Sequence, residues 1–425
     1  MSKYARPELL APAGSIHHVR AALSYGADAV YAGIPRWSLR VRGNGFTRED
    51  FKTGIELAHS MGKKFFAVLN VIPHARRLST FEEDLDSVAA LKPDAFIMAD
   101  PGLIDLALTR HPEIPVHLSV QANTVNPLSV KFWQKLGVRR CILARELSLS
   151  EIGIIREACP DMELEVFIHG ALCIAVSGRC LISGLLSRRD ANVGNCNNSC
   201  RWRFRARSLS VELEECEKRQ GEWFTLDEDE NGSYLFNSRD LCALPLLEKL
   251  LALNIDSLKI EGRSRSPFYG AAVSRAYRLA IDALLKGEPV PLESGRLLNA
   301  LPSRKFTTGL LEPHLPHETQ DYASNSPHKG RLELCAAPEA IDGGRLRLRV
   351  KNRFDVKSTL FIYTPKGALP LEVTDLRDEN GAPAEVAPGD GYIRTVPAPE
   401  GLTLEHPGEN FVVRLREEDE EDRPA

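Results

Sequence analysis

The sequence predicts an α/β protein: a (β/α)8 TIM-like barrel followed by a small C-terminal all-β domain. Over the first 290 residues, short apolar runs rich in β-branched and aromatic residues alternate with amphipathic stretches of helical period. Most apolar runs are uninterrupted, which indicates strands buried on both faces of a parallel sheet. Beyond residue 330 the pattern changes to short strands separated by turn residues, which is typical of a β domain.

Eight strand–helix units of this total length are typical of a barrel. The strands are expected at residues 8–14, 28–33, 64–70, 94–100, 116–123, 140–145, 164–170 and 255–262. The helices are expected at residues 15–25, 48–61, 79–91, 102–110, 127–136, 148–158 and 266–287. A doubly wound open sheet is the alternative, but it usually carries a glycine-rich phosphate loop after its first strand, and "APAGS" lacks that pattern.

The barrel is expected to span residues 1–290 and to carry a long insertion, at about residues 171–250, between its seventh and eighth strands. About eighty residues separate those strands, far more than an ordinary βα loop contains. Loops that follow barrel strands lie on the catalytic face, so the insertion is expected to help build the site. It also contains a predicted hairpin around "DENGS" at residues 229–233.

The rest of the chain divides into a connector, a β domain and a tail. Residues 291–329 are expected to connect the barrel to a β-barrel or sandwich at residues 330–416. Its strands are expected at residues 331–336, 344–351, 358–364, 369–376, 391–396 and 409–416. The acidic residues at 417–425 are expected to form a disordered, solvated tail.

Composition narrows the class of protein. The chain carries a formal net charge of −4, so any nucleic-acid surface has to be a local basic patch. No apolar run has the length of a signal peptide or a membrane span, so a cytoplasmic protein without membrane contact is expected. Because the cytoplasm keeps thiols reduced, the nine cysteines favour metal binding or redox chemistry over a disulfide framework. The oligomeric state stays unknown at this point.

Cysteines gather in and just after the insertion, at Cys173, Cys180, Cys196, Cys200 and Cys242. The contexts "GRC" and "GNCNNSC" are polar, glycine-rich loops with little core to fill, so these thiols are expected to have a function. Zinc is disfavoured because no C-x-x-C pair is present. An iron–sulfur cluster held by widely spaced thiolates stays open. The other cysteines are expected to be ordinary buried residues.

The segment "EVFIHGALCIAVSGRCLIS" at residues 165–183 resembles the signature of the collagenase-like peptidase family U32. Supporting matches are "ELLAPAGS", "YGADAVYAG", "RDANVGNCNNSCRW", "NSRDLC", "SLKIEGRSRSPFYGAAVSRAYRLAID" and "KFTTGLL". The resemblance covers about residues 7–310 and the C-terminal domain, and it is greatest to the tRNA hydroxylation branch of that family.

The resemblance implies an iron–sulfur enzyme that hydroxylates the wobble uridine in the anticodon loop of tRNA to 5-hydroxyuridine. It also implies that prephenate, rather than dioxygen, is the source of the hydroxyl group. Carried over residue by residue, the ligands of a 4Fe–4S cluster fall on Cys173, Cys180, Cys196 and Cys242. Cys200 is the alternative fourth ligand.

A peptidase of the collagenase type is the main alternative. The chain has no H-E-x-x-H or G-x-S-x-G motif, which gives proteolysis little support. His169 lies four residues before Cys173, however, so a Cys–His dyad stays possible. Hydroxylation of ribosomal RNA and a non-catalytic iron–sulfur accessory role are further alternatives.

Two basic stripes are candidates for RNA contacts. "RWRFRAR" places four arginines on one face of a predicted strand, namely Arg201, Arg203, Arg205 and Arg207. "RLRLRVK" repeats the pattern with Arg345, Arg347, Arg349 and Lys351. Such a stripe is either a solvated strand face or a contact to the RNA backbone, and two stripes in an acidic protein favour phosphate contacts.

Polar side chains at the strand ends are expected to face the barrel mouth, among them Asn123, Arg145, His169, Glu261 and Arg263. Prephenate is a dicarboxylate, and arginine binds carboxylates through two parallel hydrogen bonds. Arg263 follows the eighth strand and is expected to anchor this co-substrate, with Glu261 orienting its guanidinium. A structural salt bridge or strand-end hydrogen bond is the alternative for each residue.

Overall fold

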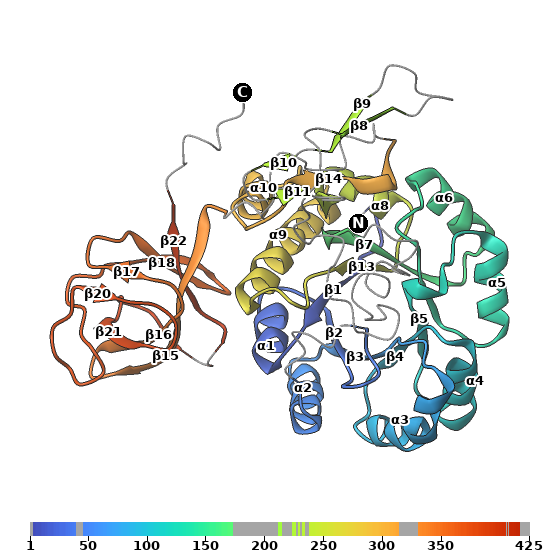
Figure 1. Cartoon of the computed structure of the whole chain (residues 1–425), viewed down its shortest axis with the longest axis horizontal. Helices are drawn as coiled ribbons and strands as arrows, with labels where there is room; N and C mark the ends of the chain where they lie inside the picture. Colours follow the sequence, from blue (N-terminus) through green and yellow to red (C-terminus); the bar gives the residue numbers. More distant parts are fainter. Residues whose placement is uncertain are drawn as a thin grey trace.

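The computed structural model describes residues 3–39, 46–172, 238–313, 330–404, 406 and 408–416, and the backbone of four short strands between residues 211 and 233. Within these residues, eight parallel strands close into a barrel surrounded by helices, and a β domain packs beside it (Figure 1). The barrel closes because β13 (Ser257–Ile260) pairs with both β1 (Glu8–Ala13) and β7 (Glu163–Ala171). The predicted fold class is therefore confirmed.

The barrel strands follow chain order, and the helices lie on their outer face. The remaining strands are β2 (Ala29–Gly33), β3 (Lys64–Leu69), β4 (Ala95–Met98), β5 (Val116–Leu118) and β6 (Arg140–Ile142). The helices are α1 (Ile16–Ser24), α2 (Arg48–Ser60), α3 (Phe81–Ala89), α4 (Pro101–Arg110), α5 (Pro127–Lys135), α6 (Leu149–Ala158), α8 (Leu247–Ala252) and α9 (Pro267–Leu285). In the described part of the chain, no helix combines the length and the apolar character that a membrane crossing requires.

Local sequence signals explain several helix starts. Thr47 and Ser148 each form a capping box with the acidic residue three positions later, at the starts of α2 and α6. Asp100, Asn126 and Ser266 cap helices whose first residue is proline, a residue that suits this position because its missing N–H is not needed there.

The fifth strand is shorter than the predicted segment 116–123. β5 ends at Leu118, and a short 3-10 helix (Val120–Ala122) replaces the rest. Asn123 closes this turn in the left-handed region with a φ of 56°. Asparagine visits that region more readily than most residues, so the sequence supports a turn here rather than a longer strand.

Two short strands extend the barrel sheet beyond the prediction. β12 (Asp240–Cys242) pairs antiparallel with the end of β7, and β14 (Phe306–Thr307) pairs parallel with β12. The connector also contains a helix, α10 (Leu292–Asn299). β12 is thereby held against the carboxyl end of β7, where a site can form.

Within the insertion, the structure describes two antiparallel strand pairs by their backbone. One pair consists of β8 (Val211–Glu214) and β9 (Trp223–Leu226). The other consists of β10 (Glu228–Asp229) and β11 (Gly232–Ser233), which confirms the predicted hairpin around "DENGS".

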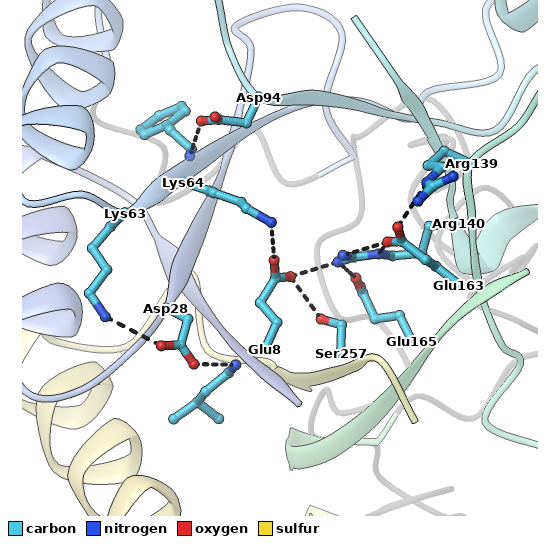
Figure 2. A network of polar contacts seen from close by, with 12 residues as sticks. Glu8, Asp28, Lys63, Lys64, Asp94, Arg139, Arg140, Glu163, Glu165 and Ser257 are labelled. Carbon is cyan, nitrogen blue, oxygen red and sulfur yellow. Dashed lines mark hydrogen bonds and ion pairs between the residues drawn. The ribbon is translucent and has the colours of Figure 1, made fainter. Parts of the chain in front are cut away.

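The amino-terminal end of the barrel contains a network of buried charges (Figure 2). Arg140 lies at its centre and pairs with three carboxylates, those of Glu8 at 2.6 Å, Glu163 at 2.9 Å and Glu165 at 3.1 Å. Burial alone would lower the pKa of Arg140, but the Glu8 and Glu165 carboxylates outweigh burial and raise it. This end of a TIM barrel normally serves stability rather than chemistry, so we assign the network a structural role.

His117 gives this interior a testable pH dependence. Its side chain is buried, and its ring lies 4.8 Å from that of Phe66. Burial lowers the pKa of His117 well below 6.5, and the positive charge of Arg140 acts in the same direction. An unfolded histidine binds a proton below about pH 6.5 while the buried one stays neutral, so stability falls as the pH drops.

We therefore expect His117→Phe to make the unfolding free energy less dependent on pH, by about 1 kcal/mol per pH unit below about pH 6. Denaturant unfolding of both proteins at two or three pH values in this range measures the difference. Parallel pH profiles would contradict the prediction.

The C-terminal domain is built on a six-stranded antiparallel sheet in the order β19-β18-β22-β15-β16-β21. Its strands are β15 (Leu332–Asp342), β16 (Arg345–Val350), β18 (Leu360–Thr364), β19 (Gly367–Leu371), β21 (Ile393–Pro397) and β22 (Phe411–Leu415), with β17 (Phe354–Asp355) pairing β20 (Val386–Ala387). Phe411 on β22 contacts the rings of Tyr25 and Phe268, and Ser24 on α1 donates to the Glu409 carboxylate at 3.0 Å. Aromatic and polar contacts thus join the domain to the barrel.

Candidate active site at the barrel mouth

Arg263 lies at the carboxyl end of the barrel, just beyond β13, and it is 8% exposed. Its guanidinium donates to the hydroxyl of Ser38 at 2.7 Å. Gly33 ends β2 at this point, and a Cβ there would lie 2.3 Å from the Ser38 hydroxyl and 3.0 Å from the Arg263 guanidinium. Glycine is therefore required at position 33 to leave room for both side chains.

Glu261 lies two residues before Arg263 and is also buried. The hydroxyl of Tyr31 on β2 donates to the Glu261 carboxylate at 3.2 Å and lies 2.9 Å from the carbonyl oxygen of Ile260. Tyr31 thus reaches past β1 and holds the end of β13. The structure places Glu261 and Arg263 in one small region, as predicted, while the orienting role of Glu261 stays a prediction.

Lys259 is a buried residue of β13 that the sequence did not predict as part of this region. It is 3% exposed, and its ammonium pairs with the Glu165 carboxylate at 2.6 Å. The ammonium also lies 4.3 Å from the centre of the Tyr31 ring and 5.5 Å from that of Phe167. Burial lowers the pKa of Lys259, and the Glu165 carboxylate offsets part of that effect.

Arg145 supplies a further cation near the mouth. It follows β6, and its guanidinium stacks 3.9 Å above the Phe167 ring while donating to the carbonyl oxygen of Ala171 at 3.2 Å. Because the Lys259 ammonium also lies within 5.5 Å of the centre of this ring, both positive charges contact Phe167. Asn123 lies half-buried after β5, at the same end of the barrel.

His169 does not face the barrel mouth, so that prediction is wrong. A β-bulge shifts the register, so that Lys259 pairs with Phe167 and Ile260 pairs with His169. The extra residue turns the imidazole to the outer face of the sheet. Its Nδ1 there lies 3.3 Å from the Tyr277 hydroxyl on α9, and burial lowers the pKa of His169 to about 3.

Gly170 explains why the segment "IHG" approaches β13 so closely. Its φ is +108°, and a Cβ at this position would lie 2.2 Å from the carbonyl oxygen of Glu261. Both the backbone conformation and the space require glycine. Glycine at position 170 therefore allows the end of β7 to lie close to the backbone of Glu261.

Cys242 is the one predicted cluster ligand within the described residues; Cys173, Cys180, Cys196 and Cys200 lie outside them. Cys242 pairs with His169 in the β7–β12 ladder, and its Sγ lies 3.7 Å from the Tyr277 hydroxyl. Burial raises the pKa of this thiol. A buried thiol beside a hydroxyl suits a cluster ligand, because iron–sulfur sites accept hydrogen bonds at sulfur and metal binding deprotonates the thiol.

Asp240 fixes the strand that carries Cys242. This carboxylate is 2% exposed and pairs with Arg265 at 3.3 Å and with Arg304 at 3.1 Å. Arg265 belongs to the loop that contains Arg263, and Arg304 precedes β14. One buried aspartate therefore connects the arginine loop of the mouth with the cysteine strand.

The two basic stripes have different outcomes. The stripe at residues 201–207 lies outside the described residues. In the second stripe, the apolar side chains of Leu346, Leu348 and Val350 are fully buried, as the alternation predicts. Its basic groups all pair with carboxylates: Arg345 with Asp375, Arg347 and Arg349 with Glu339, and Lys351 with Asp390. This pairing favours a solvated strand face over an RNA contact.

The family of the chain follows from comparison with known sequences. The sequence profile of peptidase family U32 matches residues 14–321. The chain belongs to peptidase family U32. The profile of the U32 C-terminal domain also matches residues 334–413, so the β domain is a family feature as well.

Named relatives of this U32 protein are similar over most of its length. The tRNA hydroxylation protein P of Escherichia coli (strain K12) is 42% identical, with 94% of this chain and 96% of the relative covered. The tRNA hydroxylation protein P of Haemophilus influenzae is 40% identical, with 96% of both chains covered. The 23S rRNA 5-hydroxycytidine C2501 synthase of Escherichia coli is 32% identical, with 79% of this chain and 48% of the relative covered.

Four residues of the candidate site were not predicted from the sequence: Ser38, Tyr31, Lys259 and Asp240. For Lys259 a signal was available, since it is the single charge inside the strand "SLKI". A charge in a strand that is buried on both faces needs a partner or a function. Ser38 carries no comparable signal, because only the folded chain brings it to Arg263.

Proposed function

We propose that this U32 protein is a tRNA-modifying enzyme that hydroxylates the wobble uridine to 5-hydroxyuridine. The observation that carries the proposal is the match with relatives named tRNA hydroxylation protein P, which covers 94% of this chain in one case and 96% in the other. The similarity to a 23S rRNA 5-hydroxycytidine synthase supports the wider class of RNA pyrimidine hydroxylation.

The co-substrate of the proposed reaction is prephenate, which replaces dioxygen as the source of the hydroxyl group. The chemistry of the mouth supports a small dicarboxylate, because Arg145, Lys259 and Arg263 place three cations around the rings of Phe167 and Tyr31. Arg263 binds one carboxylate through its planar guanidinium, with Ser38 holding the other side of that group. Its burial strengthens such a contact, because less water competes for the charge.

The proposed cofactor is a 4Fe–4S cluster. Cys242 would hold it together with Cys173, Cys180 and Cys196, and Cys200 is the alternative to Cys242. When bound, such a cluster supplies electron-transfer chemistry near the mouth. Tyr277 would orient Cys242 through its hydroxyl, and Asp240 would hold the strand in place between Arg265 and Arg304. A cytoplasmic location, where thiols are reduced, fits this cofactor.

Nucleoside mass spectrometry of tRNA tests the proposed function. A strain that lacks this protein should contain no 5-hydroxyuridine in its tRNA, and the intact gene should restore the nucleoside. If this strain has normal 5-hydroxyuridine in its tRNA but lacks a 5-hydroxypyrimidine in its ribosomal RNA, the substrate is ribosomal RNA rather than tRNA. An unchanged nucleoside content of both RNAs would reject the hydroxylase.

The arginines at 201–207 give a separate prediction about RNA binding. We expect Arg203→Glu combined with Arg205→Glu to weaken tRNA binding equally for all tRNA sequences and to reduce its dependence on salt, since each lost phosphate contact removes about one unit of slope. The matched control is Arg347→Glu with Arg349→Glu, because those groups already pair with Glu339. Binding measured between about 50 and 200 mM salt decides the matter. A larger effect in the control would place the RNA on the C-terminal domain.

A further inference from the structure

A lysine in the middle of the barrel calls for an explanation. TIM barrels usually fill this layer with branched apolar side chains, yet Lys259 projects into it from β13 and pairs with Glu165. A buried ion pair of this kind is weak evidence for a role in stability, because removing both charges from water costs about as much as their attraction returns. Glu165 also has a second cationic partner, Arg140, at 3.1 Å (Figure 2).

The contacts of Lys259 lead toward the mouth. Its ammonium lies 4.3 Å from the centre of the Tyr31 ring, close enough for a cation–π contact that limits where the ring can lie. The Tyr31 hydroxyl reaches the Glu261 carboxylate and the Ile260 carbonyl oxygen. The Arg263 guanidinium lies 5.7 Å from the centre of the same ring. One tyrosine thus connects the buried lysine to the two residues at the mouth.

We propose that Lys259 is a positioning residue of the carboxylate site: it holds the Tyr31 ring, and Tyr31 in turn holds Glu261 through its hydroxyl and Arg263 through its ring, where they receive a dicarboxylate. The inference rests on the proposed function, because it takes prephenate as the ligand. In this proposal Tyr31 and Lys259 have the same effect on the carboxylate site, because Lys259 acts on the mouth only through the tyrosine. It also explains why a charge is kept where an apolar side chain would fill the barrel.

Calorimetric titration of the full-length, iron-loaded protein with prephenate tests this role. Tyr31→Phe, which loses one hydrogen bond, and Lys259→Met, which loses one cation–π contact, should each raise the Kd for prephenate about tenfold. Because both act through one path, the double variant should bind about as weakly as either single variant rather than a hundredfold more weakly. The affinity for tRNA should stay unchanged in all three.

Lys64→Met is the matched control. Lys64 also pairs with a glutamate, Glu8, at 3.3 Å, but it lies at the opposite end of the barrel. Lys64→Met loses the same charge and the same number of atoms as Lys259→Met. Because Lys64 lies far from the mouth, the Kd of this variant for prephenate should equal that of the unchanged protein. A higher Kd in the control would mean that the total charge of the barrel matters rather than the position of Lys259. That result would overturn the inference.

The remaining outcomes separate this inference from the function on which it rests. An unchanged protein that binds no prephenate would overturn both. Normal binding by the unchanged protein, together with an unaltered Kd in Lys259→Met or additive losses in the double variant, would overturn the positioning role alone. A lower melting temperature with an unaltered Kd would show that Lys259 only stabilises the fold. If Lys259→Met does not fold, Tyr31→Phe decides, because it removes a single oxygen atom, and an unaltered Kd in it rejects the path.

Discussion

Alanine in place of Cys242 or Cys173 is expected to leave the anaerobically purified protein without its iron and without its visible absorption band. The intact chain should carry about four irons and four sulfides. The buried thiol of Cys242 beside Tyr277 would provide one ligand of the proposed cluster, on a strand that Asp240 holds through two ion pairs. Loss of one thiolate from a four-ligand set is expected to remove most of the cluster affinity.

Cys141→Ala is the matched control for this measurement. Cys141 is fully buried in the barrel wall, so its truncation removes the same atom from a comparable environment. It should lose some stability and keep its iron. If Cys242→Ala retains its iron and Cys200→Ala loses it, the fourth ligand is Cys200 rather than Cys242. Full iron content in both Cys173→Ala and Cys180→Ala would reject the cluster assignment.

The fold was largely predictable because parallel barrel strands are buried on both faces and read as apolar runs between helices. β12 and β14 are two of the strands that escaped prediction. They contain three and two residues, too few for any periodicity, and they form only because β7 offers an edge. Short strands of this kind depend on the tertiary structure rather than on local sequence.

The site was predictable where a charged residue follows a strand, as Glu261 and Arg263 follow β13. It was not predictable where one inserted residue reverses a side chain. The bulge in β7 turns His169 away from the mouth and toward α9, and no feature of "EVFIHG" announces it. Lys259 was missed for a different reason, because a lysine in a strand is normally read as a solvent-facing residue.

Replacing Arg263 gives the most direct test of the proposed chemistry. We expect Arg263→Ala to abolish 5-hydroxyuridine in cellular tRNA and to lower kcat/KM for prephenate roughly a hundredfold or more, since a buried charged hydrogen-bond donor to a carboxylate is lost. Iron content and tRNA affinity should stay normal, because Arg263 is not a thiol ligand and is buried at the barrel mouth, where it contacts Ser38 and the Tyr31 ring. The readouts are nucleoside mass spectrometry, iron analysis and a tRNA binding assay on the same variant.

Two further variants make this expectation specific to the guanidinium. Arg263→Lys keeps the charge but should restore little activity, because an ammonium cannot form two parallel hydrogen bonds to one carboxylate. Arg139→Ala removes an exposed arginine that pairs with Glu163 at the far end of the barrel, and it should behave like the unchanged protein. Full 5-hydroxyuridine in Arg263→Ala cells would exclude Arg263 as the anchor. If the pure protein cleaves gelatin and the Cys173→Ser variant does not, the protein is a peptidase instead. A protease that depends on this thiol needs no carboxylate anchor at the barrel mouth.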